Sequence, residues 1–364
     1  MSSHLSVLVT PRDGLHYQNM LYHDIEASGV AVHYDKGPTP SQTVNIMLAP
    51  AVLLWFRLRG VRILHIHWLF QFSLPWARRR RWARRLMEWW LGLYLQTAVR
   101  SGYAIVWTAH DLQPHEQIFT DDSRARDLLI SKTRVVIALS EATAAQVREL
   151  GAREVRVVPM GSYAHPYPVT LSRAEARSSF GFADDDTVLS LIGRIERYKG
   201  ADLLLAAAAQ LPESSRVRVL VAGICTEQAY SEELFRLSRA LGGRATIHLE
   251  WVPDEDLARF FQATDVAVFP FREITNSASV MLAQSFGVPV VIPNLSNLED
   301  IPLDAAIRYT PETEPLAEVI ADLEKMPQSV VHDVGAKGLA WATSSDWATV
   351  ARQTIEVYEL ALKA

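Results

Sequence analysis

The sequence predicts an α/β protein built from two doubly wound domains, each with a parallel sheet covered by helices. Short β-branched runs alternate with longer helical stretches, this series occurs twice in 364 residues, and a proline-rich stretch separates the two series. Strands that alternate with helices form parallel sheets through right-handed crossovers. We therefore expect the two domains to face each other across a cleft, with ligands at the carboxyl ends of both sheets.

The first half of the chain contains five stretches typical of strands and four typical of helices. The predicted strands are Leu5–Thr10, Arg62–Ile66, Ala104–Thr108, Val135–Leu139 and Val155–Val158. The predicted helices are Tyr17–Ser28, Thr43–Leu58, Ala77–Arg100 and Glu141–Leu150. The stretch Pro159–Pro168 has three prolines, one glycine and no periodicity, which indicates a linker. We expect the first domain to occupy residues 1–165.

The second half repeats this pattern and ends in one amphipathic helix. Its predicted strands are Thr187–Ile192, Val217–Ala222, Thr246–Leu249, Val266–Phe269 and Pro289–Ile292, with helices such as Ala201–Gln210 and Glu227–Ala240 between them. This domain is expected over residues 166–344. The last segment, 345–364, contains a predicted helix over Trp347–Leu362 that we expect to cross back onto the first domain.

The composition excludes several classes of protein. With 49% hydrophobic and 21% charged residues, most of the chain is not intrinsically disordered. The single cysteine, Cys225, excludes an intrachain disulfide and any cysteine-clustered zinc or iron–sulfur site. The start of the chain lacks the pattern of a signal peptide. The most apolar segment, Ile46–Phe56, is too short to span a bilayer. We therefore expect a cytoplasmic location.

Positive charge is concentrated in one predicted helix. The net charge of the chain is −5, but the stretch from Trp76 to Arg100 carries seven arginines against the single acid Glu88, a local charge of +6. Tryptophans lie among the arginines, and this pairing suits the headgroup layer of an anionic membrane. The candidate membrane-contact residues are Trp76, Arg78, Arg79, Arg80, Arg81, Trp82, Arg84 and Arg85. The alternative is a solvated helix whose tryptophans pack inward. Nucleic acid is not expected, because no recognised binding motif accompanies the patch.

The clearest chemical signal is the stretch from Gly193 to Gly200, between an apolar strand and a helix. A glycine at the end of a strand permits a sharp turn, which places Arg194 and Lys199 beside a helix N-terminus. An arginine fork, a lysine charge and free helix amides together hold a diphosphate. The alternative is a charged surface loop.

A second loop is rich in small polar residues at the start of a helix. It contains Thr275, Asn276, Ser277 and Ser279, and the helix ends at Gly287 before the next strand. Such residues cap a helix and bind a phosphate or a ribose through backbone amides. Four of them within five positions exceed the needs of a cap.

These motifs together resemble the GT-B nucleotide-sugar-dependent glycosyltransferases of the large, retaining-type group 1 class. The resemblance rests on the Gly193-Arg-x5-Gly element with Lys199, the loop before Gly287-Val-Pro-Val-Val and the Val158-Pro-Met-Gly element, and it is strongest over residues 155–295. It implies that Arg194 and Lys199 contact the donor diphosphate and that the first domain binds the acceptor. It also implies that no bound metal or other cofactor is needed, because basic residues and helix dipoles neutralise the diphosphate.

The sequence departs from that class at one place. Many members carry two glutamates eight positions apart in the second loop, and the corresponding positions here are Ile274 and Leu282, with Glu273 one place off the first. The chain instead resembles a subset with a Thr-Ser-Gly-Ser-like loop. The contacts to the ribose and to the donor sugar therefore differ from those of the common pattern.

Candidate catalytic residues follow strands of the first domain. The segment from His110 through Asp111 to Glu116 resembles the His-Asn/Asp-x-x-Pro-His-Glu segment of the same subset, and these three residues are candidates for acid–base or sugar-orienting roles. Gly14, after the first strand, is expected to let the backbone approach the donor. His65 and His67 lie on one side of a strand. For them a structural or acceptor-binding role is favoured over a metal site, which lacks a third ligand.

The sequence thus predicts a glycosyltransferase that transfers a sugar from a nucleoside diphosphate sugar to an acceptor. We expect a lipid-linked saccharide or glycolipid acceptor in polysaccharide or glycoconjugate assembly, with the protein peripheral at the inner face of the membrane. One alternative is a nucleotide-sugar epimerase of the same architecture. The other is a non-catalytic nucleotide-sugar-binding subunit. A dinucleotide-dependent dehydrogenase is disfavoured, because no G-x-G-x-x-G follows the first strand.

Overall fold

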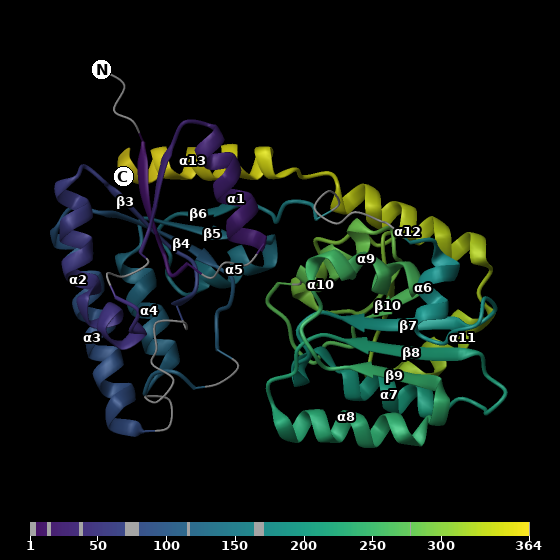
Figure 1. Ribbon diagram of the computed structural model, residues 1–364. Helices are drawn as coiled ribbons and strands as arrows, with labels where there is room; N and C mark the ends of the chain where they lie inside the picture. The colour runs from purple at the N-terminus through teal and green to yellow at the C-terminus, as the bar shows by residue number, and fades with distance from the viewer. Residues whose placement is uncertain are drawn as a thin grey trace. The chain divides into compact units, whose positions relative to one another are not determined.

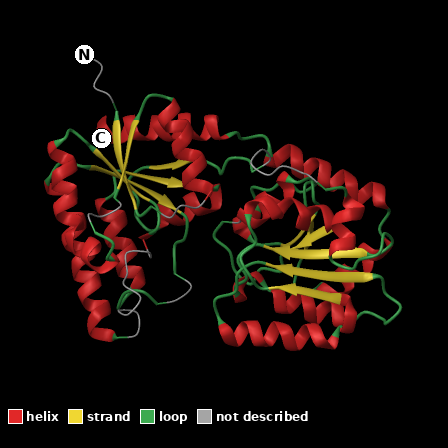
Figure 2. Cartoon of the chain, viewed as in Figure 1, coloured by secondary structure: helices red, strands yellow, loops and turns green. Residues whose placement is uncertain are grey.

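A computed structural model of the chain describes residues 5–12, 16–35, 39–69, 80–114, 117–163, 171–276 and 278–363. The chain divides into two compact units. Unit 1 comprises Met1–Gly161 and Asp346–Ala364, and unit 2 comprises Ser162–Ser345. Each unit has a parallel sheet with helices on both faces (Figure 2).

The sheet of unit 1 has the strand order β2-β1-β3-β4-β5-β6, and every described pair is parallel. Its strands are β1 (Ser6–Thr10), β2 (Ala31–Tyr34), β3 (Ile63–Ile66), β4 (Ala104–Ala109), β5 (Val135–Ala138) and β6 (Val155–Val157). All residues of β3, β4 and β5 are buried, as expected for central strands covered on both faces.

The helices of unit 1 include one from the end of the chain. They are α1 (His16–Ala27), α2 (Gln42–Leu58), α3 (Arg81–Arg100), α4 (Asp122–Lys132), α5 (Glu141–Glu149) and α13 (Trp347–Lys363). The C-terminal helix α13 packs against α1 and against strands β3, β4 and β5 (Figure 1). Side-chain caps set two helix starts, since Asp121 accepts from the amide of Arg124 and Ser140 from that of Thr143.

Unit 2 has a sheet of the same kind, with the strand order β12-β11-β10-β7-β8-β9. Its strands are β7 (Thr187–Ile192), β8 (Val217–Ala222), β9 (Ala245–His248), β10 (Val266–Val268), β11 (Val290–Pro293) and β12 (Ile307–Tyr309). Its helices are α6 (Arg173–Ser179), α7 (Ala201–Ala209), α8 (Gln228–Ala240), α9 (Asp254–Ala263), α10 (Ala278–Ser285), α11 (Leu316–Lys325) and α12 (Gln328–Ala342).

The predicted α/β fold class is confirmed, and the differences lie at the sheet edges. The edge strands β2 and β12 were not predicted. Both are only three or four residues long and partly exposed, so neither carries a continuous apolar run. Predicted strand ends differ by about one residue from the observed ones, as at Thr246–Leu249, which the structure places at Ala245–His248.

The strand order of each sheet shows where its topological switch point lies, which is the usual position of a ligand in open α/β sheets. In unit 2 the chain runs outward from β7 to β9 and then returns to add β10 on the other side of β7. The loops after β7 and β10 therefore diverge to opposite faces. Ligands of open α/β sheets bind in the crevice at such a switch point. In unit 1 the equivalent point lies between β1 and β3.

Candidate functional site

Glycines bring three segments of unit 2 into close contact at the switch point. Gly193 and Gly223, which follow β7 and β8, have φ angles of 128° and 133°. A Cβ atom on Gly223 would lie 1.9 Å from the carbonyl oxygen of Gly193. A Cβ on Gly193 would lie 2.9 Å from Oγ of Ser279, at the start of α10. The first turn of α10 therefore sits directly against the backbone that leaves β7.

Lys199 is buried beneath this turn. It ends the short helical turn Arg197–Lys199, and its side chain is only 7% exposed. The ammonium donates a hydrogen bond to Oγ of Ser279, with an Nζ–Oγ distance of 2.8 Å. Burial lowers the pKa of Lys199 to about 8, with a smaller contribution in the same direction from Arg194 and an opposing one from Glu196. Among the described residues no carboxylate forms an ion pair with this ammonium.

Arg194 lies at the rim and already has a counter-charge. Its side chain is 62% exposed, and Nε lies 2.5 Å from Oε1 of Glu196. The two predicted cations therefore differ in kind. Lys199 is fixed and desolvated, whereas Arg194 is solvated and ion-paired.

The loop before α10 supplies backbone donors. Thr275 and Asn276 are half-buried, and Ser279, the second residue of α10, is buried. The first amides of a helix have no partner within the helix, and its N-terminus carries partial positive charge. A helix N-terminus beside a buried ammonium is a combination that suits an anion. Ser277 lies outside the described residues.

A charged cluster that the sequence did not reveal braces these loops. Arg272, after β10, pairs with Asp202 of α7 at 2.6 Å and donates to the carbonyl oxygen of Arg197 at 2.6 Å. Tyr230 of α8 donates to the same carboxylate at 2.7 Å. Because these bonds join the loops after β7 and β10, they fix the position of the lysine relative to α10. No local sequence signal indicates pairing between residues 70 positions apart.

The positions of the missing glutamates are apolar in the structure too. Ile274 is half-buried, and Asn297 donates to its carbonyl oxygen at 2.6 Å. Leu282 lies within α10 and is also half-buried, while Glu273 is exposed. No carboxylate occupies either position.

In unit 1, His110 follows β4 and is 7% exposed. Its ring stacks on Trp68 with a centroid distance of 3.8 Å, and its Nε2 lies 3.0 Å from Nδ1 of His67. Asp111 is half-buried beside it. Gly14 and Glu116 lie outside the described residues.

The two strand histidines predicted to share a side do so, inside the core. His65 and His67 are at most 1% exposed, and their rings lie 4.1 Å apart. Burial lowers the pKa of His67 to about 3 and lowers those of His65 and His110 well below the ordinary value. Within the described part of the chain no group of three potential metal ligands occurs.

The basic helix α3 presents an exposed apolar row. Trp82, Leu86, Trp89 and Leu93 are 43–65% exposed and follow one helical face. Arg80, Arg81 and Arg85 are exposed and Arg84 half-buried, while Trp90 packs inward and stacks on Tyr94. Trp76, Arg78 and Arg79 lie outside the described residues.

The neighbouring helix α2 continues this surface. Met47, Leu54, Trp55 and Leu58 are 47–89% exposed, and the guanidinium of Arg59 lies 3.5 Å from the centre of the Trp55 ring. Within the described segments, no helix is both long and apolar enough to cross a bilayer.

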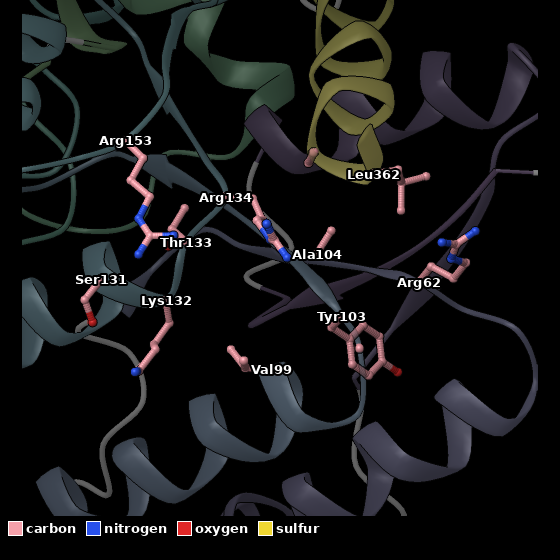
Figure 3. A pocket seen from close by; sticks show the side chains of 12 residues that line it. Arg62, Val99, Tyr103, Ala104, Ser131, Lys132, Thr133, Arg134, Arg153 and Leu362 are labelled. Carbon is pink, nitrogen blue, oxygen red and sulfur yellow. The ribbon is translucent and has the colours of Figure 1, made fainter. Parts of the chain in front are cut away.

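A cationic pocket of about 400 Å³ lies at the amino ends of the strands of the unit 1 sheet (Figure 3). His110 follows the other, carboxyl end of β4. Its charged lining residues are Arg62, Lys132, Arg134 and Arg153. The last residues of α4 and α13, together with Val99 near the end of α3, also line it. Because the carbonyl ends of helices attract cations, these side chains complement the helix dipoles.

Comparison with known proteins identifies the family to which unit 2 is similar. A model of the family described as glycosyl transferases group 1 matches residues 172–338, which is nearly all of unit 2. Unit 2 is a glycosyl transferases group 1 domain. The predicted family is confirmed by this match and by the relatives below.

Curated relatives are named glycosyltransferases. The D-inositol 3-phosphate glycosyltransferase of Actinosynnema mirum is 29% identical over 258 residues, which cover 65% of this chain and 57% of that protein. D-inositol 3-phosphate glycosyltransferase 2 of Catenulispora acidiphila is 27% identical over 316 residues, covering 83% and 71%. The alignments thus span between about half and three quarters of the relatives' length.

Solved structures share the whole fold. HepE of Anabaena in complex with UDP and glucose superposes with a TM-score of 0.75 at 17% identity, covering 98% of this chain and all of that one. Sucrose-phosphate synthase of Thermosynechococcus elongatus gives 0.75 at 18% identity, with 98% of both chains covered. The predicted GT-B fold, with two doubly wound α/β domains, is confirmed.

Proposed function

We propose that this group 1 chain is a glycosyltransferase that transfers a sugar from a nucleoside diphosphate sugar to an acceptor, and that unit 2 binds the donor. The position of Lys199 carries this proposal. A buried ammonium without a carboxylate partner among the described residues lies at a helix N-terminus, at the switch point of the sheet. An anionic diphosphate supplies the counter-charge that this ammonium lacks.

The chemistry requires two things of the protein. The negative charge that develops on the departing nucleoside diphosphate must be stabilised, and fixed donors do this best because they need no reorganisation. Lys199, with the amides of α10, fills this role, and Arg194 reaches the diphosphate from the rim after leaving Glu196. The acceptor hydroxyl must also lose its proton. His110, Asp111 and Glu116 of unit 1 are our candidates for that step and for orienting the sugars.

UDP is the first donor base to test, because HepE has been crystallised with UDP and with UDP-glucose. The acceptor is proposed to be a lipid-linked saccharide or glycolipid. The exposed tryptophans and arginines of α3 and the exposed apolar side chains of α2 support this choice, because they suit an anionic membrane surface. The names of the relatives indicate a phosphorylated cyclitol as the competing, soluble acceptor.

Thermal unfolding with UDP, GDP, ADP and CMP, with and without magnesium, tests the donor site. A ligand at 100 times its Kd adds about 2.7 kcal/mol of stability, which is visible in a melt. We expect one nucleoside diphosphate to stabilise the chain without magnesium, and Lys199→Met to reduce this shift at the same ligand concentration. No shift with any nucleotide would refute the donor site.

Product analysis then separates the three candidate functions. A transferase gives a glycosylated acceptor and a free nucleoside diphosphate, in vesicles that carry lipid-linked saccharide or with a soluble phosphorylated cyclitol. An epimerase changes the sugar without an acceptor. A binding subunit is stabilised by the nucleotide but consumes no donor in any of these mixtures.

A further inference from the structure

The cationic pocket of unit 1 gathers positive charge without a balancing carboxylate among the described residues that line it. Four cations line it, Arg62, Lys132, Arg134 and Arg153, and the other lining residues are uncharged. The chain as a whole has a net charge of −5, so this local excess runs against its average composition. Like charges around one cavity repel one another, and an anion that enters the cavity relieves this repulsion.

Helix ends account for only part of this charge. Lys132 lies in the last turn of α4, where the partial negative charge of the helix C-terminus favours a cation. Arg62 and Arg153 lie outside the helices, shortly before β3 and β6. The position of these two arginines therefore needs another explanation than the dipole of a helix to which they belong.

Three of the four cations have no fixed partner in the part of the chain that the structure describes. The side chains of Arg62, Lys132 and Arg153 form no hydrogen bond or ion pair with another described residue, whereas Arg134 takes part in a further interaction and is not counted with them. Glu154, the neighbour of Arg153 in sequence, pairs instead with Arg156 at 3.0 Å. The three side chains are thus available to a ligand.

The sheet fixes the main chain that carries these cations. The amide of Ala104, the first residue of β4, donates to the carbonyl oxygen of Arg62 at 2.9 Å. The amide of Arg134, two residues after Lys132, donates to the carbonyl oxygen of Ile105 at 2.8 Å. The pocket is therefore built on the rigid edge of a sheet, which is the kind of support that a precise binding site requires.

A further guanidinium lies beside the wall of the pocket. Nε of Arg57, near the end of α2, donates to the carbonyl oxygen of Ser101 at 2.7 Å. A Cβ atom on Gly102, which lines the pocket, would lie 3.5 Å from Nη2 of the same arginine. The positive charge thus continues along this wall.

The strand order sets the spacing of the cations. Because β3, β4, β5 and β6 are successive neighbours, the starts of β3 and β6 lie about 14 Å apart at the usual strand spacing. Figure 3 shows Arg62 and Arg153 on opposite sides of the pocket. A single phosphate contacts both arginines only if both side chains turn fully inward, whereas an anion with several phosphates spans the distance. Guanidinium forks match phosphate oxygens in geometry and charge.

We propose that this pocket is a second anion site, in addition to the donor site proposed in unit 2, and that Arg62, Lys132 and Arg153 bind a molecule with two or more phosphate groups. Its volume of about 400 Å³ is typical of a small-molecule site. The last residues of α13 also line it, so the ligand ties this helix to α4 and the sheet and stabilises unit 1. Two sources supply such phosphates, a soluble molecule and a lipid headgroup.

Calorimetry on the full chain with tripolyphosphate, pyrophosphate and orthophosphate tests the site. Lys199→Met serves as the parent, so that the proposed donor site contributes little. We expect tripolyphosphate to bind most tightly and orthophosphate most weakly. Arg62→Gln and Arg153→Gln should each weaken tripolyphosphate binding about two- to fivefold, and the double variant about tenfold, because solvent screens exposed charges.

Arg124→Gln is the matched control, because it removes an exposed arginine at the other end of α4 and should bind tripolyphosphate like the parent. Unchanged affinity in the double variant overturns the proposal, and so does a parent that binds no tripolyphosphate. Binding to the wild type but not to Lys199→Met would place the polyphosphate in the donor site and also overturn it. Citrate that binds as tightly at the same ionic strength would refute the assignment to phosphate.

Vesicles distinguish the two sources of phosphate. Phosphatidylcholine vesicles that contain cardiolipin, whose headgroup carries two phosphates, are pelleted with the parent and with the double variant, which both keep α3 intact. A smaller pelleted fraction for the double variant, restored to neither chain by added tripolyphosphate, assigns the pocket to a lipid headgroup. Equal pelleting, together with weakened tripolyphosphate binding, assigns it to a soluble molecule.

Discussion

The ammonium of Lys199 and the hydroxyl of Ser279 lie 2.8 Å apart and join the loop after β7 to the first turn of α10. These two loops leave neighbouring strands at the switch point of the unit 2 sheet. Desolvating a cation costs free energy unless a partner compensates, and one hydroxyl compensates only in part. Under the proposed function, the nucleoside diphosphate supplies the rest of this compensation when it binds.

Replacing Lys199 with methionine should separate binding from stability. Charge-assisted hydrogen bonds contribute about 1.5–3 kcal/mol, so the affinity for the nucleoside diphosphate should fall about 10- to 150-fold. The unliganded melting temperature should change little or rise, because a buried charge is replaced by an apolar chain of similar length. Titration calorimetry and thermal melts measure the two effects. Lys325→Met, on an exposed pair with Asp322, is the control. Undiminished affinity would rule out a role for Lys199 in the donor site.

The pH dependence follows from the pKa of Lys199, which is about 8 in the folded chain against an ordinary 10.5. Between these values the unfolded chain binds a proton that the folded chain does not, so this group's contribution to stability rises with pH from 8 to 10.5. The diphosphate binds the charged form, so its affinity should fall above pH 8 by at most tenfold per unit. Calorimetry between pH 7 and 10 should show this fall in the wild type. An equal fall in Lys199→Met would assign it to another group.

Arg194→Ala should weaken the same ligand less than Lys199→Met. Arg194 is 62% exposed and paired with Glu196, so the diphosphate must displace this carboxylate, and solvent screens the resulting contact. We expect a loss below about tenfold, and a gain in affinity for Glu196→Gln, which releases the guanidinium. Calorimetry of the two single variants gives the comparison. A larger loss from Arg194→Ala would make the rim arginine the principal contact.

The glycines at the strand ends provide a test of the close contact between the loops after β7 and β8. Gly223→Ala places a methyl group 1.9 Å from a backbone oxygen that cannot move without disturbing β7, in addition to a φ of 133° that disfavours alanine. We expect a loss of several kcal/mol or failure to fold, measured by chemical denaturation. Gly243→Ala, where no atom lies within 4 Å, should be nearly neutral. Wild-type stability of Gly223→Ala would mean that the loops after β7 and β8 are not in contact.

The sequence predicted the parts of this site that depend on local pattern. Lys199 and Ser279 each lie where a strand gives way to a helix, and parallel topology brings the ends of neighbouring strands together. The bracing pair Asp202 and Arg272 was beyond prediction, because it depends on which loops meet. The contact of Tyr358 with His65 spans 293 residues and requires the path of α13 across unit 1. Periodicity indicates an amphipathic helix there but not the side chain its apolar face meets.

The exposed side chains of α3 can be tested for binding to anionic membranes. The double variant Trp82→Ser with Trp89→Ser removes the two tryptophans that face outward and spares the buried Trp90. We expect it to pellet less with vesicles that contain anionic phosphatidylglycerol, because an interfacial ring is lost at each position. Replacing Arg81 and Arg85 with serine should weaken binding by about 1 kcal/mol each and reduce its sensitivity to salt.

The control for this experiment is Trp251→Ser, because that tryptophan is 61% exposed in unit 2, on a surface without the arginine cluster. It should pellet like the wild type, and vesicles of phosphatidylcholine alone should retain little of any variant. If the α3 variants pellet like the control, the membrane proposal is wrong, and the soluble phosphorylated acceptor becomes the better hypothesis. If only the arginine variant loses binding, attraction is electrostatic and the rings do not insert. Loss of binding in both the tryptophan and the arginine variants would place α3 at the membrane–water interface, with its arginines at the lipid phosphates and its tryptophans among the headgroups.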